Sequence, residues 1–287
     1  MSRASETRLT RLSTTAAAGT LLWISRTSFG LLASYPLLLA IRASAMTAGP
    51  DGDTVLFQPG SLLLLELLRL GGAWLSSAAE LSLLLLGGFA IFELIPLAIA
   101  LDFLVAPERR WRERVARAMR YFPKFLGLGL IALLAQAALL LAASLLSAAA
   151  KPMFASSDER VRSLAPLALL GLGLVACGAF GGVLDIARAT LIRRDVEAGG
   201  ARAALAQAVD CFRQQPLRVL LGPYPSVAGS AFAVLGATWV LLRFAPSQSS
   251  NAALVLSFGA HQLAMLFAIA WRVRWLRGAL ELSAESD

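Results

Sequence analysis

The chain has 287 residues, of which 57% are hydrophobic and 15% charged, and its formal net charge is +8. This composition is far from that of an ordinary soluble domain. The arginines gather at the ends of apolar segments, where anionic lipid headgroups account for them, so the charge does not indicate nucleic-acid binding. The apolar runs leave no room for a separate soluble domain. We therefore predict one integral membrane domain over residues 1–287.

Six segments are long and apolar enough to cross a hydrocarbon core, which takes about 20 residues. They lie near 27–46, 76–105, 125–149, 164–191, 219–243 and 252–271. The sequence therefore predicts an all-α fold, a polytopic bundle of six transmembrane helices.

The connections between these segments alternate in charge. Residues 106–124 and 192–218 are rich in arginine, whereas 47–60 and 244–251 contain no lysine or arginine. Basic loops stay on the cytoplasmic side, so both termini are predicted to be cytoplasmic. The Ala- and Leu-rich composition, with almost no lysine, is typical of a GC-rich bacterial genome, and we expect a bacterial plasma membrane.

The N-terminus has two interpretations. Ala43-Ser44-Ala45 resembles a signal-peptidase site after an apolar stretch, which would make the first segment a cleaved signal peptide. The long polar lead before Arg26 instead favours an uncleaved first span, preceded by an Ala/Thr/Ser-rich helix of its own. The rest of the predicted topology is the same in both cases.

The second apolar region is too long for one span. Residues 61–105 would make a single helix of about 67 Å, roughly twice the hydrocarbon thickness. The Gly71-Gly72 pair is a natural break, so 61–70 is expected to form a short helix at the outer interface.

Two arginine-rich loops are predicted to be amphipathic helices. One covers 109–122 and the other 199–213, and each carries an apolar stripe opposite a basic face. The first stripe is Trp111, Val115, Met119 and Phe122, and the second is Ala201, Leu205, Val209 and Phe212. Such helices suit the headgroup boundary, which makes anionic membrane lipids the expected partners.

The two amphipathic helices also align with each other at an offset of 90 residues. Arg112 then matches Arg202, and Phe122 matches Phe212. The repeating unit would be an interfacial helix, a span, an outer connection and a second span. Each copy starts in the cytoplasm, so these would be parallel hairpin repeats.

Two predicted spans hold polar side chains near mid-depth, where polar groups are costly. His261 lies beside Gln262, and Glu93 lies near Pro96. Each could act in proton or cation transfer, or could make a hydrogen bond or ion pair that fixes helix packing. The packing interpretation is favoured for His261, because no acidic partner is visible in its span.

Two other features of the fourth span indicate packing. Gly178 and Gly182 form a GxxxG pattern, which lets another helix approach closely. Asp185 and Arg188, three residues apart, are expected to form an ion pair within the helix.

No catalytic, metal or cofactor signature is present. Two cysteines and one histidine do not make a metal site. Ser230 and His261 resemble the Ser–His dyad of rhomboid proteases, but Gly229-Ser230-Ala231 departs from that family's Gly-x-Ser-Gly and no glycines follow His261. We therefore predict no catalytic residues.

The layout resembles a broad group of bacterial six-helix membrane proteins that includes the membrane domain attached to some glycerophosphodiester phosphodiesterases. The resemblance rests on the spans and on the stretch from Arg202-Ala203-Ala204-Leu205 to Pro216-Leu217-Arg218. It implies no chemistry, because the phosphodiesterase activity of such proteins belongs to a separate soluble domain.

We therefore expect a non-catalytic module that organises lipid or holds a partner, either another membrane protein or a second copy of this chain. A small-solute or ion transporter using Glu93 and His261 is the alternative, and an intramembrane enzyme is the third.

Overall fold

The computed structural model describes residues 3–47, 72–154, 159–194, 200–225, 236 and 251–285. Every regular element within these residues is helical, which agrees with the predicted all-α class. The elements are α1 (Arg3–Thr47), α3 (Gly72–Phe92), α4 (Leu94–Val105), α5 (Trp111–Ala150), the short 3-10 helix η2 (Lys151–Phe154), α6 (Glu159–Arg194), α7 (Gly200–Gln214), α8 (Pro216–Leu221) and α10 (Asn251–Glu285).

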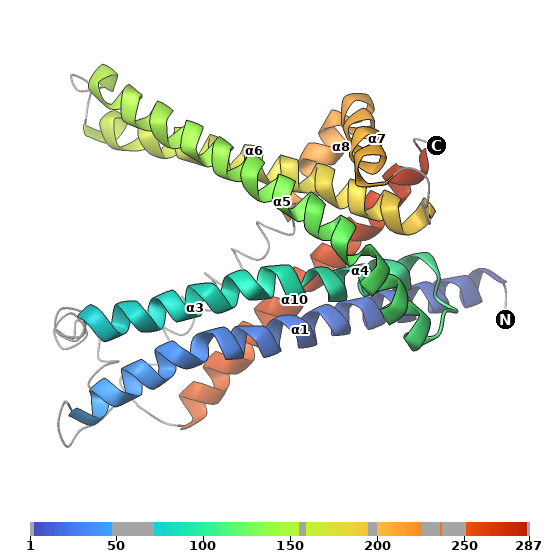
Figure 1. Cartoon of the computed structure of the whole chain (residues 1–287), viewed down its shortest axis with the longest axis horizontal. Coiled ribbons are helices and arrows are strands. Elements are labelled where there is room, and N and C mark those ends of the chain that lie inside the picture. Colours follow the sequence, from blue (N-terminus) through green and yellow to red (C-terminus); the bar gives the residue numbers. More distant parts are fainter. Residues whose placement is uncertain are drawn as a thin grey trace.

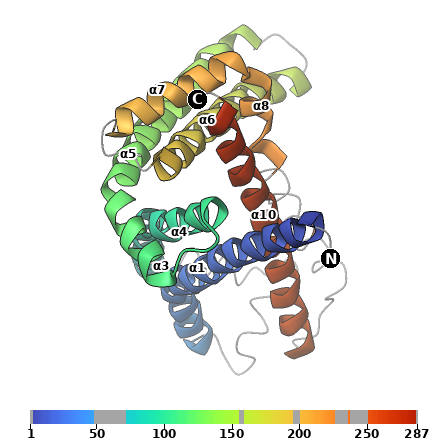
Figure 2. The same cartoon turned by 90° about the vertical axis from the view of Figure 1, so that its right-hand side faces the viewer.

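The helices form two arms that meet at one end of the molecule. Helices α5 and α6 pack along each other in one arm, and α1, α3 and α10 make up the other (Figure 1). Helices α4, α7 and α8 lie at the end where the arms meet, and both ends of the chain lie there too (Figure 1). Figure 2 shows α10 running from this end past α1, with α7 lying across α6. We call the shared end the base.

Three helical stretches among the described residues are long and apolar enough to cross a membrane. They are Ser76–Val105, Trp111–Ala150 and Leu167–Arg194. These stretches agree in position, length and apolar character with three of the predicted spans, 76–105, 125–149 and 164–191. Away from the base the helices present leucines outward, and Leu84 and Leu134 are 73% and 72% exposed. Lipid chains would cover such side chains in a bilayer.

The other three predicted spans are not among these stretches. Segments 27–46 and 252–271 fall within α1 and α10. Helix α1 begins well before the first segment, and α10 ends well after the second. Most of 219–243 lies outside the described residues, as does the short helix expected at 61–70. The six-span topology therefore remains a prediction.

The prediction of a separate helix before the first span is wrong. Helix α1 runs without interruption for 45 residues and contains both the polar lead and the apolar segment. Ala18 and Leu22, one turn apart on the lead, are almost fully buried in the core at the base. Packing of this face stabilises the polar half as part of the same helix.

A single non-helical residue separates α3 from α4. Pro96 has no N–H to donate to the Phe92 carbonyl, and its ring crowds that carbonyl. The neighbouring bonds remain, with Glu93 N donating to Phe89 O at 2.7 Å and Leu97 N donating to Glu93 O at 3.0 Å. The proline thus places Glu93 at a turn within the span Ser76–Val105.

The predicted amphipathic helix 109–122 is not separate from the next span. Helix α5 is continuous for 40 residues and passes through Pro123. Its buried positions Arg114, Ala118, Tyr121 and Phe125 continue on one face across the proline. The proline removes one backbone hydrogen bond, and packing of this face outweighs the loss.

Helix α7 agrees within a residue with the amphipathic helix predicted at 199–213, but its apolar side faces protein. Ala204, Ala208 and Cys211 are buried against the core. The predicted stripe adjoins them and is half-buried on the same cluster. Helix α7 packs on α6 and α10, so its apolar side stabilises the base.

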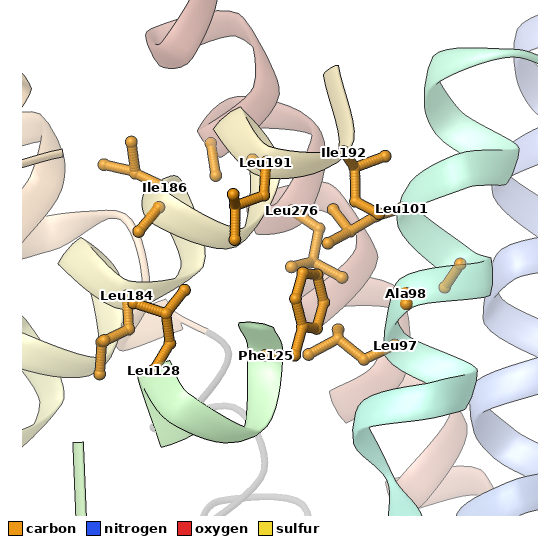
Figure 3. Packing of buried hydrophobic residues seen from close by; sticks show 14 of the residues in the cluster. Leu97, Ala98, Leu101, Phe125, Leu128, Leu184, Ile186, Leu191, Ile192 and Leu276 are labelled. Atoms are coloured by element: carbon orange, nitrogen blue, oxygen red, sulfur yellow. The ribbon is translucent and has the colours of Figure 1, made fainter. Parts of the chain in front are cut away.

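Among the described residues, the hydrophobic core near the base joins α4, α5, α6 and α10 with α1, α7 and α8. Phe125 of α5 lies close to Leu97 and Leu101 of α4 and to Leu276 of α10, while Leu128 meets Leu184 of α6 (Figure 3). This core positions the charged side chains described below.

The predicted packing glycines of α6 lie close to the segment that follows α7. A Cβ at Gly182 would lie 3.0 Å from the Val219 carbonyl oxygen and 3.2 Å from Pro223 Cγ, and one at Gly178 would lie 3.1 Å from the Tyr224 ring.

The Gly182→Ala substitution is expected to destabilise the protein by about 1–3 kcal/mol, because backbone must move to admit the methyl group. Thermal unfolding in detergent measures the change. Gly181→Ala is the matched control, since its Cβ would meet only Gln136 Nε2 at 3.8 Å. Equal midpoints for the two variants would contradict close packing at Gly182.

Candidate functional site

Asp102 is the centre of the first charged cluster at the base. It lies near the end of α4, and its side chain is 1% exposed. Arg114 Nη1 and Arg117 Nε each donate to it at 3.2 Å, and Arg109 Nη1 donates as well. The short connection between α4 and α5 brings all three arginines to this one carboxylate.

Arg114 uses its guanidinium to hold the chain reversal between α4 and α5. Its Nη2 donates to the carbonyl oxygens of Ala106 at 2.7 Å and Pro107 at 2.8 Å, and its Nε donates to Arg109 O at 3.0 Å. The guanidinium also lies 4.0 Å from the centre of the Phe103 ring. With Asp102 on Nη1, each of its three nitrogens has an acceptor, so Arg114 has a structural role.

Asp185 of α6 is the centre of the second cluster. Arg272 of α10 donates to both of its oxygens, through Nη2 to Oδ1 at 2.8 Å and through Nη1 to Oδ2. Trp275 Nε1 donates to Oδ2 at 2.9 Å. The bond from Arg188 Nη1 to Oδ1, which the sequence predicts, is present but long at 3.4 Å. The main partner of Asp185 is therefore on another helix.

Sequence reasoning did not find Arg272 or Trp275 as partners of Asp185. The available signal was their spacing of three residues, which places both on one face of α10. Nothing in a single sequence pairs that face with α6, because the two segments are almost 90 residues apart.

Glu93 pairs with Arg26 of α1, whose Nε donates to Glu93 Oε1 at 2.6 Å. Both side chains line a cavity of about 180 Å³. Arg188 and Arg272 line the same cavity, so the second cluster and the Glu93 pair meet there. We call this space the arginine cavity; its apolar lining is Leu22, Ala90, Leu94 and Leu97.

Gln262 joins α10 to α1. Its Oε1 accepts hydrogen bonds from Trp23 Nε1 at 3.0 Å and from Thr27 Oγ1 at 3.3 Å. His261 beside it is half-buried. The described residues that line the arginine cavity include Glu93 but not His261. This cavity therefore does not bring the two predicted site residues together.

The apolar stripe predicted at the start of α5 divides into two pairs. Trp111 and Met119 are 53% and 54% exposed. Val115 and Phe122 are half-buried against the core. An exposed aromatic next to arginines suits a membrane interface, whereas the other two side chains stabilise the base.

The described residues contain no group of three or more His, Cys, Asp or Glu side chains placed to hold a metal ion. Cys177 and Cys211 are both buried free thiols. Ser230, the serine of the hypothetical dyad, lies outside the described residues.

No family model, no curated protein and no solved structure matches this chain. Its function must therefore be inferred from the geometry at the base.

Asp102→Asn is expected to destabilise the protein by about 3–5 kcal/mol, because the buried Arg114 would lose its charge partner. Asp210→Asn is the control. Asp210 pairs with Arg213 at 3.6 Å, but both side chains are more than half exposed, so little change is expected. Thermal unfolding in detergent compares the two. Similar small shifts would show that Asp102 does not stabilise the base.

Proposed function

We propose that this protein is a non-catalytic, six-span module of a bacterial plasma membrane that binds anionic headgroups and organises lipid or a partner protein around it. The observation that carries the proposal is the contrast between leucine-covered arms and an arginine-rich base. This contrast suits a molecule whose arms lie in lipid chains and whose base meets headgroups.

The start of α5 provides the headgroup contact. Arg110, Arg112 and Arg120 are exposed there, and so are Trp111 and Met119. Arginines attract anionic headgroups, and an exposed tryptophan favours the interface. This combination supports binding at the cytoplasmic surface, with both termini on that side.

The pairing of three acids supports packing rather than proton transfer. Glu93, Asp102 and Asp185 each accept from an arginine of another helix. Gln262 also joins two helices. Side chains that are paired in this way stabilise a helix bundle that other molecules can contact.

Two hydrogen bonds support the parallel repeat. Arg117 Nη2 of α5 donates to the Ile192 carbonyl at the end of α6, at 3.4 Å. Gln207, 90 positions after Arg117, donates through Nε2 to Ser283 O at the end of α10, at 3.4 Å. Both helices thus rest on the end of a long helix, and Ile192 and Ser283 are separated by nearly the same offset. This agreement is what a hairpin repeat would produce.

The predicted orientation can be tested by cysteine labelling in intact cells, after Cys177 and Cys211 have been replaced by serine. Arg112→Cys should be protected from an impermeant reagent, and Asp51→Cys should react, because basic loops stay in the cytoplasm. Labelling at residue 112 before permeabilisation would contradict the topology.

The headgroup contact can be tested with the double variant Arg112→Gln/Arg120→Gln. Each arginine near an anionic surface is worth about 1 kcal/mol, so the variant should retain less phosphatidylglycerol relative to phosphatidylcholine. Counting the lipids that remain bound after mild detergent extraction measures this ratio. Glu113→Gln is the control, because it removes a negative charge instead of a positive one, and it should not lower the ratio. An unchanged ratio in the double variant would contradict the proposal.

A small-solute or ion transporter is the second candidate, and the arginine cavity at Glu93 is the observation that favours it. A charged side chain that lines a cavity inside a bundle marks a possible pathway.

Glu93→Gln and His261→Gln separate the two candidates. If the residues serve packing, the variants should lower the thermal midpoint through a loss of about 1 kcal/mol each, without an effect on flux or growth. Lost flux or growth with unchanged stability and expression would instead make this protein a transporter.

A further inference from the structure

The arginine cavity holds more positive than negative charge. Arg26, Arg188 and Arg272 line it. The carboxylates beside them are Glu93, which pairs with Arg26, and Asp185, which pairs with Arg272. Among the described residues, three guanidinium groups and two carboxylates leave one positive charge over. An uncompensated charge inside a protein is costly unless a counter-ion or water reaches it.

Arg188 is the arginine that its neighbours satisfy least. Asp185 already accepts two bonds from Arg272 and one from Trp275, so Arg188 Nη1 reaches it only at 3.4 Å. The Nε of Arg188 is buried and has no hydrogen-bond acceptor among the described residues. Its side chain is 12% exposed, so bulk water does little to solvate it.

The size of the cavity limits what could neutralise this charge. Its volume of about 180 Å³ is below the roughly 300–1,000 Å³ of sites for drug-sized ligands. A single phosphate or carboxylate group with some water fits such a space. The apolar wall of Leu22, Ala90, Leu94 and Leu97 suits an ester or acyl stem attached to that group.

Two of these arginines, Arg188 and Arg272, also line a larger space. A second cavity of about 450 Å³ is lined by Arg188, Asp185 and Arg272, together with Gln136 and Pro223. The same guanidinium groups therefore face two cavities, and an anion has room to approach them.

We propose that the arginine cavity is an oxyanion-binding site, in which Arg188, with Arg26 and Arg272, holds one phosphate or carboxylate group. A guanidinium donates well to such groups because its donors match their geometry. A phospholipid headgroup and a small soluble anion share this chemistry. The inference that the bound anion is a lipid headgroup rests on the proposed function, whereas the inference of an anion-binding site does not.

Full-length protein in a non-ionic detergent tests the site. Dihexanoyl phosphatidylglycerol, inorganic phosphate and acetate are titrated separately at fixed ionic strength, and the rise in thermal midpoint yields an apparent Kd for each. Dihexanoyl phosphatidylcholine is the lipid control. A rise with phosphatidylglycerol alone identifies a headgroup as the ligand, and a rise with phosphate or acetate identifies a soluble anion.

Two variants make the test specific, because removing a positive charge and removing a negative charge should change the Kd in opposite directions. Arg188→Gln should raise the Kd about tenfold or more, the effect of losing a charge-assisted hydrogen bond. Glu93→Gln should lower the Kd, because it increases the surplus of positive charge. Arg213→Gln, which removes an exposed arginine that does not line the cavity, should leave the Kd unchanged. If Arg188→Gln does not fold, the Kd of Glu93→Gln still tests the proposal. A purely structural role for these residues would raise that Kd instead of lowering it.

Three results would overturn the site. They are no rise in midpoint with any of the three anionic probes, an unchanged Kd in Arg188→Gln, and an equal loss of affinity in Arg213→Gln. The proposed headgroup contact is tested separately by Arg112→Gln/Arg120→Gln, which do not line this cavity, so the two proposals can fail independently.

Discussion

The base of this protein depends on how buried charge is compensated. Asp102 and Asp185 are almost fully removed from solvent, and an isolated carboxylate in such a place would cost several kcal/mol. Each is surrounded by arginine side chains whose donors converge on its oxygens. The helices that carry these groups must therefore meet in one arrangement, because any other would leave a charge without a partner.

The two carboxylates take their arginine partners from different distances along the chain. Asp102 takes its partners from the next helix, so its cluster fixes the local reversal between α4 and α5. Asp185 takes Arg272 from the last helix, so its cluster joins distant parts of the fold. The first cluster shapes one connection, and the second determines how α6 and α10 cross.

The charges around the arginine cavity are not fully balanced, because the arginines that line it outnumber the described carboxylates beside them. This imbalance bears on the function. A bundle needs only balanced pairs for stability, so a surplus guanidinium is more than packing requires. The surplus lies beside an apolar wall, between helices long and apolar enough to cross a membrane. Both the organisation of lipid and the transport of a solute would use a site of this chemistry, so the cavity links the two candidate functions.

The sequence by itself determined the helical class, three helical stretches long and apolar enough to cross a membrane, and helix α7, because apolar length and amphipathic period are local properties of the chain. It also located Glu93 and the Asp185–Arg188 pair, since a charge within an apolar segment and an i,i+3 spacing are visible without a structure. It did not show that the polar lead belongs to α1, that α5 continues through Pro123, or that Arg26, Arg272 and Trp275 are the partners of the buried acids. Only the tertiary structure decided these, because burial of Ala18, Leu22 and Phe125 and the convergence of distant arginines arise from packing between helices far apart in the chain.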